Sequence, residues 1–138
     1  MTDAMLPPEV TEAVQRREMY RANAVKALEA YEYPKAAELT WGAATQEWIR
    51  SAFFLKGEVI GRWHAQYRDL CTELATLTGD RFYVDGYNEL NHLHNFFYRD
   101  SALAAPEVKV PELMHLADEM IEKLEELIAA KLSTPETE

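Results

Sequence analysis

Residues suited to chemistry are concentrated in the segment 87–100, which reads YNELNHLHNFFYRD. Four hydrogen-bonding side chains recur there at i, i+4, i+7 and i+11: Tyr87, Asn91, His94 and Tyr98. On a helix this spacing places them on one face, beside the apolar face formed by Leu90, Leu93 and Phe97. Half-buried polar groups need partners, so the row predicts either a hydrogen-bond network between helices or contact with a ligand.

A second polar line comes earlier in the chain. His64 and Arg68 stand one helical turn apart, and Cys71 continues the line. If the helices carrying the two lines are antiparallel neighbours, the lines converge. An arginine and a histidine together can bind a phosphate group and transfer a proton near neutral pH. The two lines therefore make a phosphate site possible, and a purely structural network is the alternative.

A di-metal centre is a further alternative. The chain holds two Glu-x-x-His motifs, Glu89 to His92 and Glu112 to His115, and pairs of such motifs build di-iron sites in helical bundles. Glu112 is also explained by its place near a helix start, where an acid is favourable. Two short motifs are only a mild excess over chance, so we predict no metal site and no cofactor.

Composition limits the classes of protein that remain. The chain has 138 residues, 48% of them hydrophobic, and a formal net charge of -10. Such acidity argues against diffuse binding to nucleic acid or to anionic membranes. There is one cysteine, so an internal disulfide is excluded, and neither an apolar run of about 20 residues nor a signal peptide is evident. We expect a cytoplasmic protein that does not associate with membranes.

The charge is unevenly distributed along the sequence. The segment 48–68 carries four basic residues against one acid, whereas the rest of the chain is acidic. Ordinary salt bridging explains such a segment. The alternative is a local anion site on a surface that repels other polyanions.

Hydrophobic periodicity predicts about five helices. We expect them at 9–32, at 34–56, from about 60 to 77, at 82–100, and from Pro111 onward, with a loop at 101–110. The fourth helix has two candidate starts: Asp85 as its N-cap, or a start near Arg81. The expected fold is an all-α, up-down antiparallel helical bundle in a single domain, 1–132, followed by a flexible acidic tail at 133–138.

The core faces of these helices follow from the same periodicity. The first helix contributes Val14 and Tyr31 among others, and the second places Trp41 and Trp48 among alanines. The remaining predicted core positions include Ile60, Trp63, Tyr67, Leu70, Leu74 and Leu77, and later Leu113, Leu116, Met120, Ile121, Leu124, Leu127 and Ile128.

Three motifs of the chain resemble a known superfamily. They are Gly61-Arg-Trp-His64, Leu77-Thr-Gly79-Asp80 and Leu93-His94-Asn95-Phe96-Phe97-Tyr98. Together they are similar to the HEPN superfamily (higher eukaryote and prokaryote nucleotide-binding), most closely to its PaREP-type branch. The resemblance covers roughly residues 20–130. It implies a helical up-down bundle that commonly forms a homodimer.

The resemblance also carries expectations about function. Some HEPN proteins are metal-independent ribonucleases in which four to six residues separate an arginine from the catalytic histidine. Here Glu89 stands five residues before His94 and Asn88 stands six before, so that arginine is missing. Other members bind nucleotides or act as partners of nucleotidyltransferases. The superfamily histidine corresponds best to His94, and Asn95, Tyr98 and His64 also fit the PaREP-type pattern.

These observations lead to one leading hypothesis and two alternatives. We expect a dimer that binds a nucleotide, an RNA element or another phosphate-bearing ligand. Its ligand-binding residues are predicted to be Arg62, His64, Arg68, Asn91, Asn95 and Tyr98, with His94 as the candidate catalytic residue. The alternatives are a degenerate ribonuclease that uses His94 and a non-catalytic dimeric interaction module.

Overall fold

The described part of the chain is predominantly helical. The computed structural model describes residues 6–99 and 104–134, with only the backbone for 97–99. Within these ranges the chain forms six helices and no strand, which confirms the all-α prediction. The helices are α1 (Pro8–Thr11), α2 (Ala13–Glu29), α3 (Tyr33–Lys56), α4 (His64–Thr78), α5 (Phe82–Arg99) and α6 (Pro106–Ser133).

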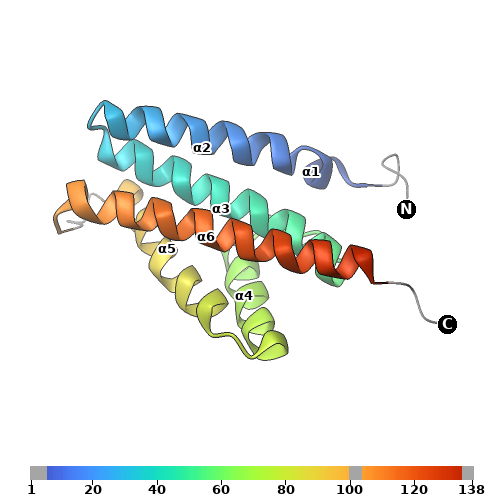
Figure 1. Ribbon diagram of the computed structural model, residues 1–138. Coiled ribbons are helices and arrows are strands. Elements are labelled where there is room, and N and C mark those ends of the chain that lie inside the picture. The colour runs from blue at the N-terminus through green and yellow to red at the C-terminus, as the bar shows by residue number, and fades with distance from the viewer. Residues whose placement is uncertain (1–5, 100–103, 135–138) are drawn as a thin grey trace.

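Helix α3 is the centre of the bundle. Figure 1 shows α2, α3 and α6 side by side along their lengths, with α4 and α5 forming a hairpin that crosses them at a steep angle. The hairpin returns the chain to the end of the bundle at which α3 begins. Helices α3 and α6 therefore run in the same direction. Helix α3 packs against α2, α4, α5 and α6, so its side chains supply the middle of the core.

Tryptophans and alanines alternate along α3 and determine its packing. Trp48 is fully buried, and its ring centroid lies 5.4 Å from that of Trp41 and 5.5 Å from that of Tyr87. The alanines are buried too, and their small size allows neighbouring helices to approach closely. The predicted core face of this helix is confirmed.

Two predicted helix boundaries are wrong. The helix expected at 9–32 is divided into α1 and α2 by Glu12, whose backbone stays helical. The loop expected at 101–110 is shorter, since α6 already begins at Pro106 and contains Pro111. Pro111 is the sixth residue of α6, past the four N–H groups that a helix start leaves unpaired, so α6 accommodates it at the cost of one backbone hydrogen bond.

The connection between α3 and α4 is longer than periodicity predicted. Gly57 ends α3 with a φ of 69°, and residues 57–63 are not helical. The side-chain oxygen of Gln66 accepts the backbone N–H groups of residues 61, 62 and 63, each at 3.0 Å, and so fixes the start of α4. Ile60 therefore reaches the core from the connection, whereas Trp63 is 63% exposed and is not a core residue.

The ends of the α4–α5 hairpin follow from local hydrogen bonds. Gly79 caps α4 with a φ of 73°, as its sequence context indicates. The carboxylate of Asp80 accepts the N–H of Phe82 at 2.9 Å, so Asp80 rather than Asp85 caps the start of α5.

Three other predicted core residues are exposed. Val14 lies on the outer side of α2, Tyr31 lies in the turn before α3 with a φ of 60°, and Leu77 lies in the last turn of α4. All three stand at or near helix ends. The predicted tail begins inside α6, which continues to Ser133, and its part from 135 onward lies outside the described residues.

None of the helices in the described ranges is both long and apolar enough to cross a membrane.

Candidate functional site: a histidine cleft

An open cleft lies where α3, α4 and α5 meet, with α2 at its edge. Its volume is about 440 Å³. Helix α3 forms most of its floor and α4 and α5 contribute one histidine each. The lining residues are Tyr20, Glu38, Leu39, Trp41, Gly42, Thr45, Gln46, His64, Tyr67 and His94. Two of the residues predicted from sequence, His64 and His94, therefore face the same cleft.

His64 is the first residue of α4 and is held from two sides. Its ring stacks on Trp41 with 5.1 Å between centroids and 18° between planes. Its Nε2 lies 3.1 Å from Oδ1 of Asn91 on α5. An amide oxygen only accepts hydrogen bonds, so Nε2 of His64 carries the proton and donates it. In the neutral ring the lone pair is then on Nδ1.

His94 faces His64 across the cleft. The two ring centroids are 5.2 Å apart, and the His94 ring lies 5.3 Å from that of Trp41. Burial lowers the pKa of His94, and the nearby His64 lowers it further because two adjacent imidazolium charges repel. The pair therefore favours a state in which the two rings share fewer than two positive charges.

Glu38 completes the cluster from α3. Its Oε2 lies 3.7 Å from Nδ1 of His94, and both atoms are sealed from solvent. Burial raises the pKa of Glu38. The cleft thus combines two imidazoles and one carboxyl group, a set that can bind an anion and move a proton. Asn91 is not among the lining residues and contacts the site through His64.

Both predicted arginines lie outside the cleft lining. Arg62 is exposed and its guanidinium lies 5.4 Å from the Trp63 ring centroid. Arg68 is exposed and contacts Asp69 at 3.3 Å. Asn95 is partly buried on α5 and is not among the lining residues, and the side chain of Tyr98 lies outside the described residues.

The basic segment 48–68 does not form a cationic cluster. Arg50 binds Glu125 with its Nε 2.7 Å from the carboxylate, and Lys56 contacts Glu58 and Glu73. Ordinary ion pairing, the simpler of the two interpretations, therefore accounts for these cations.

Several lining residues were missed in the sequence. Glu38, Trp41 and Thr45 stand at i, i+3 and i+7 on α3, so they share one face. Trp41 was assigned only to the core, and Glu38 was not noticed. The sequence did contain a signal for them. In a helix rich in alanine, Glu38 and Thr45 are polar residues on the same face as Trp41.

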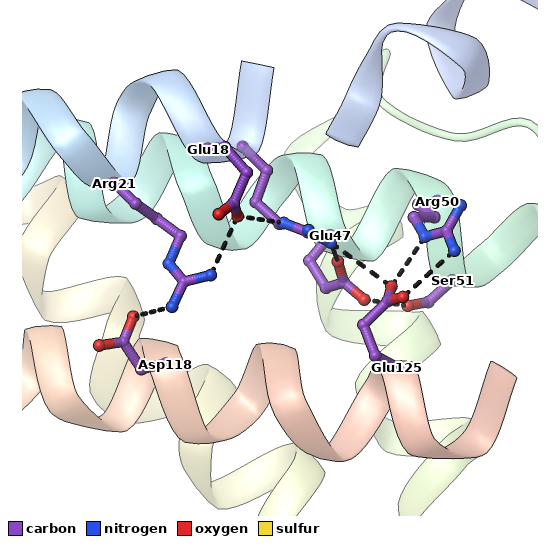
Figure 2. A network of polar contacts seen from close by, with 8 residues as sticks. Glu18, Arg21, Glu47, Arg50, Ser51, Asp118 and Glu125 are labelled. Atoms are coloured by element: carbon purple, nitrogen blue, oxygen red, sulfur yellow. Dashed lines mark hydrogen bonds and ion pairs between the residues drawn. The ribbon is translucent and has the colours of Figure 1, made fainter. Parts of the chain in front are cut away.

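A second polar cluster lies elsewhere in the bundle and was not predicted. Figure 2 shows Glu47 of α3 and Glu125 of α6 pointing toward one another. Arg17 donates to Glu47 at 2.8 Å, while Arg50 donates to both oxygens of Glu125. Burial and a hydrogen bond with Glu125 raise the pKa of Glu47 to about 9, although Arg17 opposes the shift. This cluster joins three helices and lines no part of the histidine cleft.

The Glu-x-x-His motifs show no metal-binding arrangement. Glu89 and Glu112 both contact Lys109, at 3.7 and 3.8 Å, and His92 and His115 are exposed. Across residues 6–99 and 104–134, no group of three or more His, Cys, Asp or Glu side chains is placed to hold a metal ion. Cys71 is buried in the core, and burial raises the pKa of its thiol.

Comparisons of the chain with family models, with curated proteins and with solved structures gave no match. The similarity to the HEPN superfamily thus stays an expectation carried by residues such as His64 and His94. Function is inferred from the geometry of the cleft and the chemistry of its side chains.

Proposed function

We propose that the cleft binds a phosphate-bearing ligand, a nucleotide or an RNA element, between His64 and His94. The observation that carries the proposal is the pair of imidazoles, supplied by different helices, that face one open cleft 5.2 Å apart. Histidines become cationic near neutral pH and donate charge-assisted hydrogen bonds to phosphate oxygens.

The charge of the cleft suits a ligand of low charge. Its described lining holds two histidines and one carboxyl group, with neither lysine nor arginine. Because repulsion between the imidazoles disfavours double protonation, the pair favours carrying at most one positive charge. One phosphate group, as in a mononucleotide or a phosphodiester link, matches that charge better than a triphosphate.

Tyr20 supports a ligand that carries a planar base. Its ring lines the cleft from α2 and packs directly on α3, since a Cβ added at Gly42 would lie 3.2 Å from it. A tyrosine at the edge of a phosphate site offers a face for stacking, which contributes about 1–3 kcal/mol per base.

The test is a calorimetric titration with adenosine 5′-monophosphate and with inorganic phosphate. We expect His64→Gln and His94→Gln each to weaken nucleotide binding roughly 10- to 100-fold, the effect of losing one charge-assisted hydrogen bond. His92→Gln is the matched control, because His92 is exposed on the same helix as His94 and does not line the cleft. Equal weakening in all three variants, or no binding by the unmodified protein, would count against the proposal.

A degenerate ribonuclease is the second candidate. Two histidines so close together, each contacting a different polar partner, can serve as general base and general acid. In that case the protein cleaves RNA in the presence of a metal chelator, and His94→Gln abolishes the cleavage. Retained cleavage in His94→Gln would exclude His94 as the catalyst.

The proposals about partners rest on the resemblance alone. They are a homodimer and a nucleotidyltransferase partner. The cytoplasmic location is proposed on other grounds, because a chain with one cysteine suits a reducing compartment. If neither a nucleotide nor RNA raises the melting temperature, the interaction-module alternative becomes the better account.

A further inference from the structure

We propose that a second cavity, between α2, α3 and α6, binds a small apolar molecule that carries one positively charged amino group. The amino group contacts Asp118 at the solvent side of the cavity, and the other end of the molecule reaches Thr40. This cavity and the histidine cleft have no lining residue in common. The inference is therefore independent of whether the histidine cleft binds a phosphate.

The interior of this cavity is apolar. Its volume is about 330 Å³, at the lower end of the range for small-molecule sites. Its apolar lining is formed by Ala22, Ala24 and Val25 of α2, Ala43 of α3, and Met114 and Ala117 of α6. Alanines leave space where the three helices meet, and a methionine side chain adapts to the shape of what it contacts. The cavity thus suits a ligand with one or two rings.

The solvent side of the cavity is charged. Figure 2 shows Arg21 of α2 extending toward Asp118 of α6, with Glu18 beside it. Arg21 donates to Glu18 at 2.9 Å and lies 3.1 Å from Asp118. Burial opposes ionisation of Glu18, but hydrogen bonds from Arg17 and Arg21 outweigh it, so the pKa of Glu18 is lowered. One positive charge therefore faces two negative charges in the described lining.

These charges favour a cationic ligand over an anionic one. A ligand carboxylate that approached Arg21 would be repelled by Glu18 and Asp118, which already hold the guanidinium group. An ammonium group would be attracted by both acids. Within the described part of the chain Arg21 is the one charged partner of Asp118, and a carboxylate can accept several hydrogen bonds. Asp118 therefore retains the capacity to accept a hydrogen bond from an ammonium group.

Thr40 supplies a polar group within the apolar part of the cavity. The residue lines the cavity and is 4% exposed, and within the described ranges its Oγ1 has no hydrogen-bond partner. Threonines of α4 differ, since Thr72 and Thr78 donate to the carbonyl group one turn earlier. An unpaired buried hydroxyl group is unfavourable, and threonine populates two rotamers in a helix. A polar group of the ligand can thus provide the partner that Oγ1 of Thr40 lacks.

The experiment is a calorimetric titration of the full-length protein near pH 7 with tryptamine, tryptophol and indole-3-propionate. These probes share an indole ring and a two-carbon linker, and they end in an ammonium, a hydroxyl and a carboxylate group respectively. We expect one tryptamine per chain, bound roughly 10-fold more tightly than tryptophol, with indole-3-propionate the weakest. Absence of tryptamine binding, or binding of indole-3-propionate as tight as that of tryptamine, would overturn the proposal.

Variants of the lining test whether tryptamine occupies this cavity. Ala22→Leu adds bulk at an exposed lining position and should weaken tryptamine binding at least roughly 10-fold, whereas Ala129→Leu, exposed on α6 outside the cavity, should not. Asp118→Asn should weaken it roughly 5-fold, and Glu122→Gln, the same change of charge one turn further along α6, should leave it unaltered. Unchanged binding in Ala22→Leu, or equal losses in Asp118→Asn and Glu122→Gln, would place the ligand elsewhere and overturn the proposal.

Thr40→Val tests the buried end of the site. The variant keeps nearly the same shape and removes the hydroxyl group. It should weaken tryptamine binding several-fold without lowering the melting temperature of the free protein, because the hydroxyl has no partner to lose. 1-Methyltryptamine, which lacks the indole N–H, should bind the variant and the unmodified protein alike. A lowered melting temperature with unchanged tryptamine affinity would show that Thr40 has a structural role and would overturn its assignment to the ligand.

Discussion

At the scale of single residues, the chemistry of the cleft depends on what holds each imidazole. His64 stacks on Trp41 and donates to Asn91, and His94 contacts Glu38 while it faces His64. Each ring is thus held by contacts with other side chains. The two rings are close enough that a charge on His64 lowers the pKa of His94.

This coupling predicts how binding depends on pH. The deoxydinucleotide d(ApA) keeps a single phosphodiester charge over the range of interest, so the protein alone titrates. The affinity of the protein for d(ApA) should rise as the pH falls from about 7.5 to about 5.5, because a protonated imidazole binds the phosphodiester anion more strongly. Since the pKa of His94 is lowered, much of the rise should occur below the ordinary histidine pKa of about 6.5.

Calorimetry at several pH values measures this dependence. In His94→Gln the curve should flatten, and in the exposed control His92→Gln it should match the unmodified protein. An affinity that is constant with pH, or that rises toward alkaline pH, is incompatible with binding through imidazolium groups.

The sequence predicted part of this site. The spacing of Asn91 and His94 on one helical face and the position of His64 on the preceding helix were sufficient to suggest that they meet. The arginines were misplaced because side-chain length and local ion pairing, as between Arg68 and Asp69, are not encoded in helical spacing. Glu38 was missed because its role depends on which helix packs across it.

At the scale of helices, the most informative feature is the charged cluster that joins α2, α3 and α6. Glu47 is completely buried, and its Oε2 lies 3.5 Å from the hydroxyl of Ser51. For Glu125, burial opposes ionisation, but hydrogen bonds with Arg50 and Glu47 outweigh it, so its pKa is lowered. Near neutral pH the two carboxyl groups therefore differ in protonation state: Glu47 is protonated and Glu125 is ionised.

This division predicts how stability depends on pH. The folded pKa of Glu47 is about 9 and its ordinary value is 4.5, so between these values the folded protein binds a proton that the unfolded chain has released. The contribution of Glu47 is therefore fully present below about pH 4.5 and is lost as the pH rises toward 9. The free energy of unfolding should fall by an amount on the order of 6 kcal/mol across the full range.

Urea unfolding at several pH values tests this prediction. Glu47→Gln keeps a neutral hydrogen-bonding group of similar size and should remove most of the decline. Glu122→Gln, an exposed change on α6, should retain it. A decline that persists unchanged in Glu47→Gln would show that Glu47 is ionised in the folded protein.

Helix positions were more predictable than helix ends. The faces of α3 and α6 followed from periodicity, because long helices buried along most of their length repeat the pattern many times. The start of α4 did not, since it is determined by the amide of Gln66, which accepts three N–H groups. A single side-chain contact of this kind leaves no periodic signal.

At the scale of the whole molecule, the net charge of -10 and a small phosphate site are compatible. Most of the cations that suggested a basic segment are paired with acids, as Arg50 is with Glu125. The surface therefore disfavours long polyanions in general. Recognition of a phosphate would depend on the two imidazoles and their neighbours rather than on a broad basic face.

The fold explains how two histidines from different helices come to face the same cleft. Helix α3 carries the cleft floor, and the α4–α5 hairpin crosses it so that His64 and His94 arrive from separate helices. Both rings contact Trp41, which is itself fixed against Trp48 in the core. The histidines are thus positioned by the packing of the bundle.

The most direct test of the account is a histidine NMR titration with adenosine 5′-monophosphate. The chain has four histidines, of which His64 and His94 line the cleft and His92 and His115 are exposed outside it. The account predicts that the ring signals of His64 and His94 shift together and saturate at one ligand per chain, while those of His92 and His115 stay in place. Signals of His64 and His94 that do not respond, or that shift no more than those of the two exposed histidines, would contradict it.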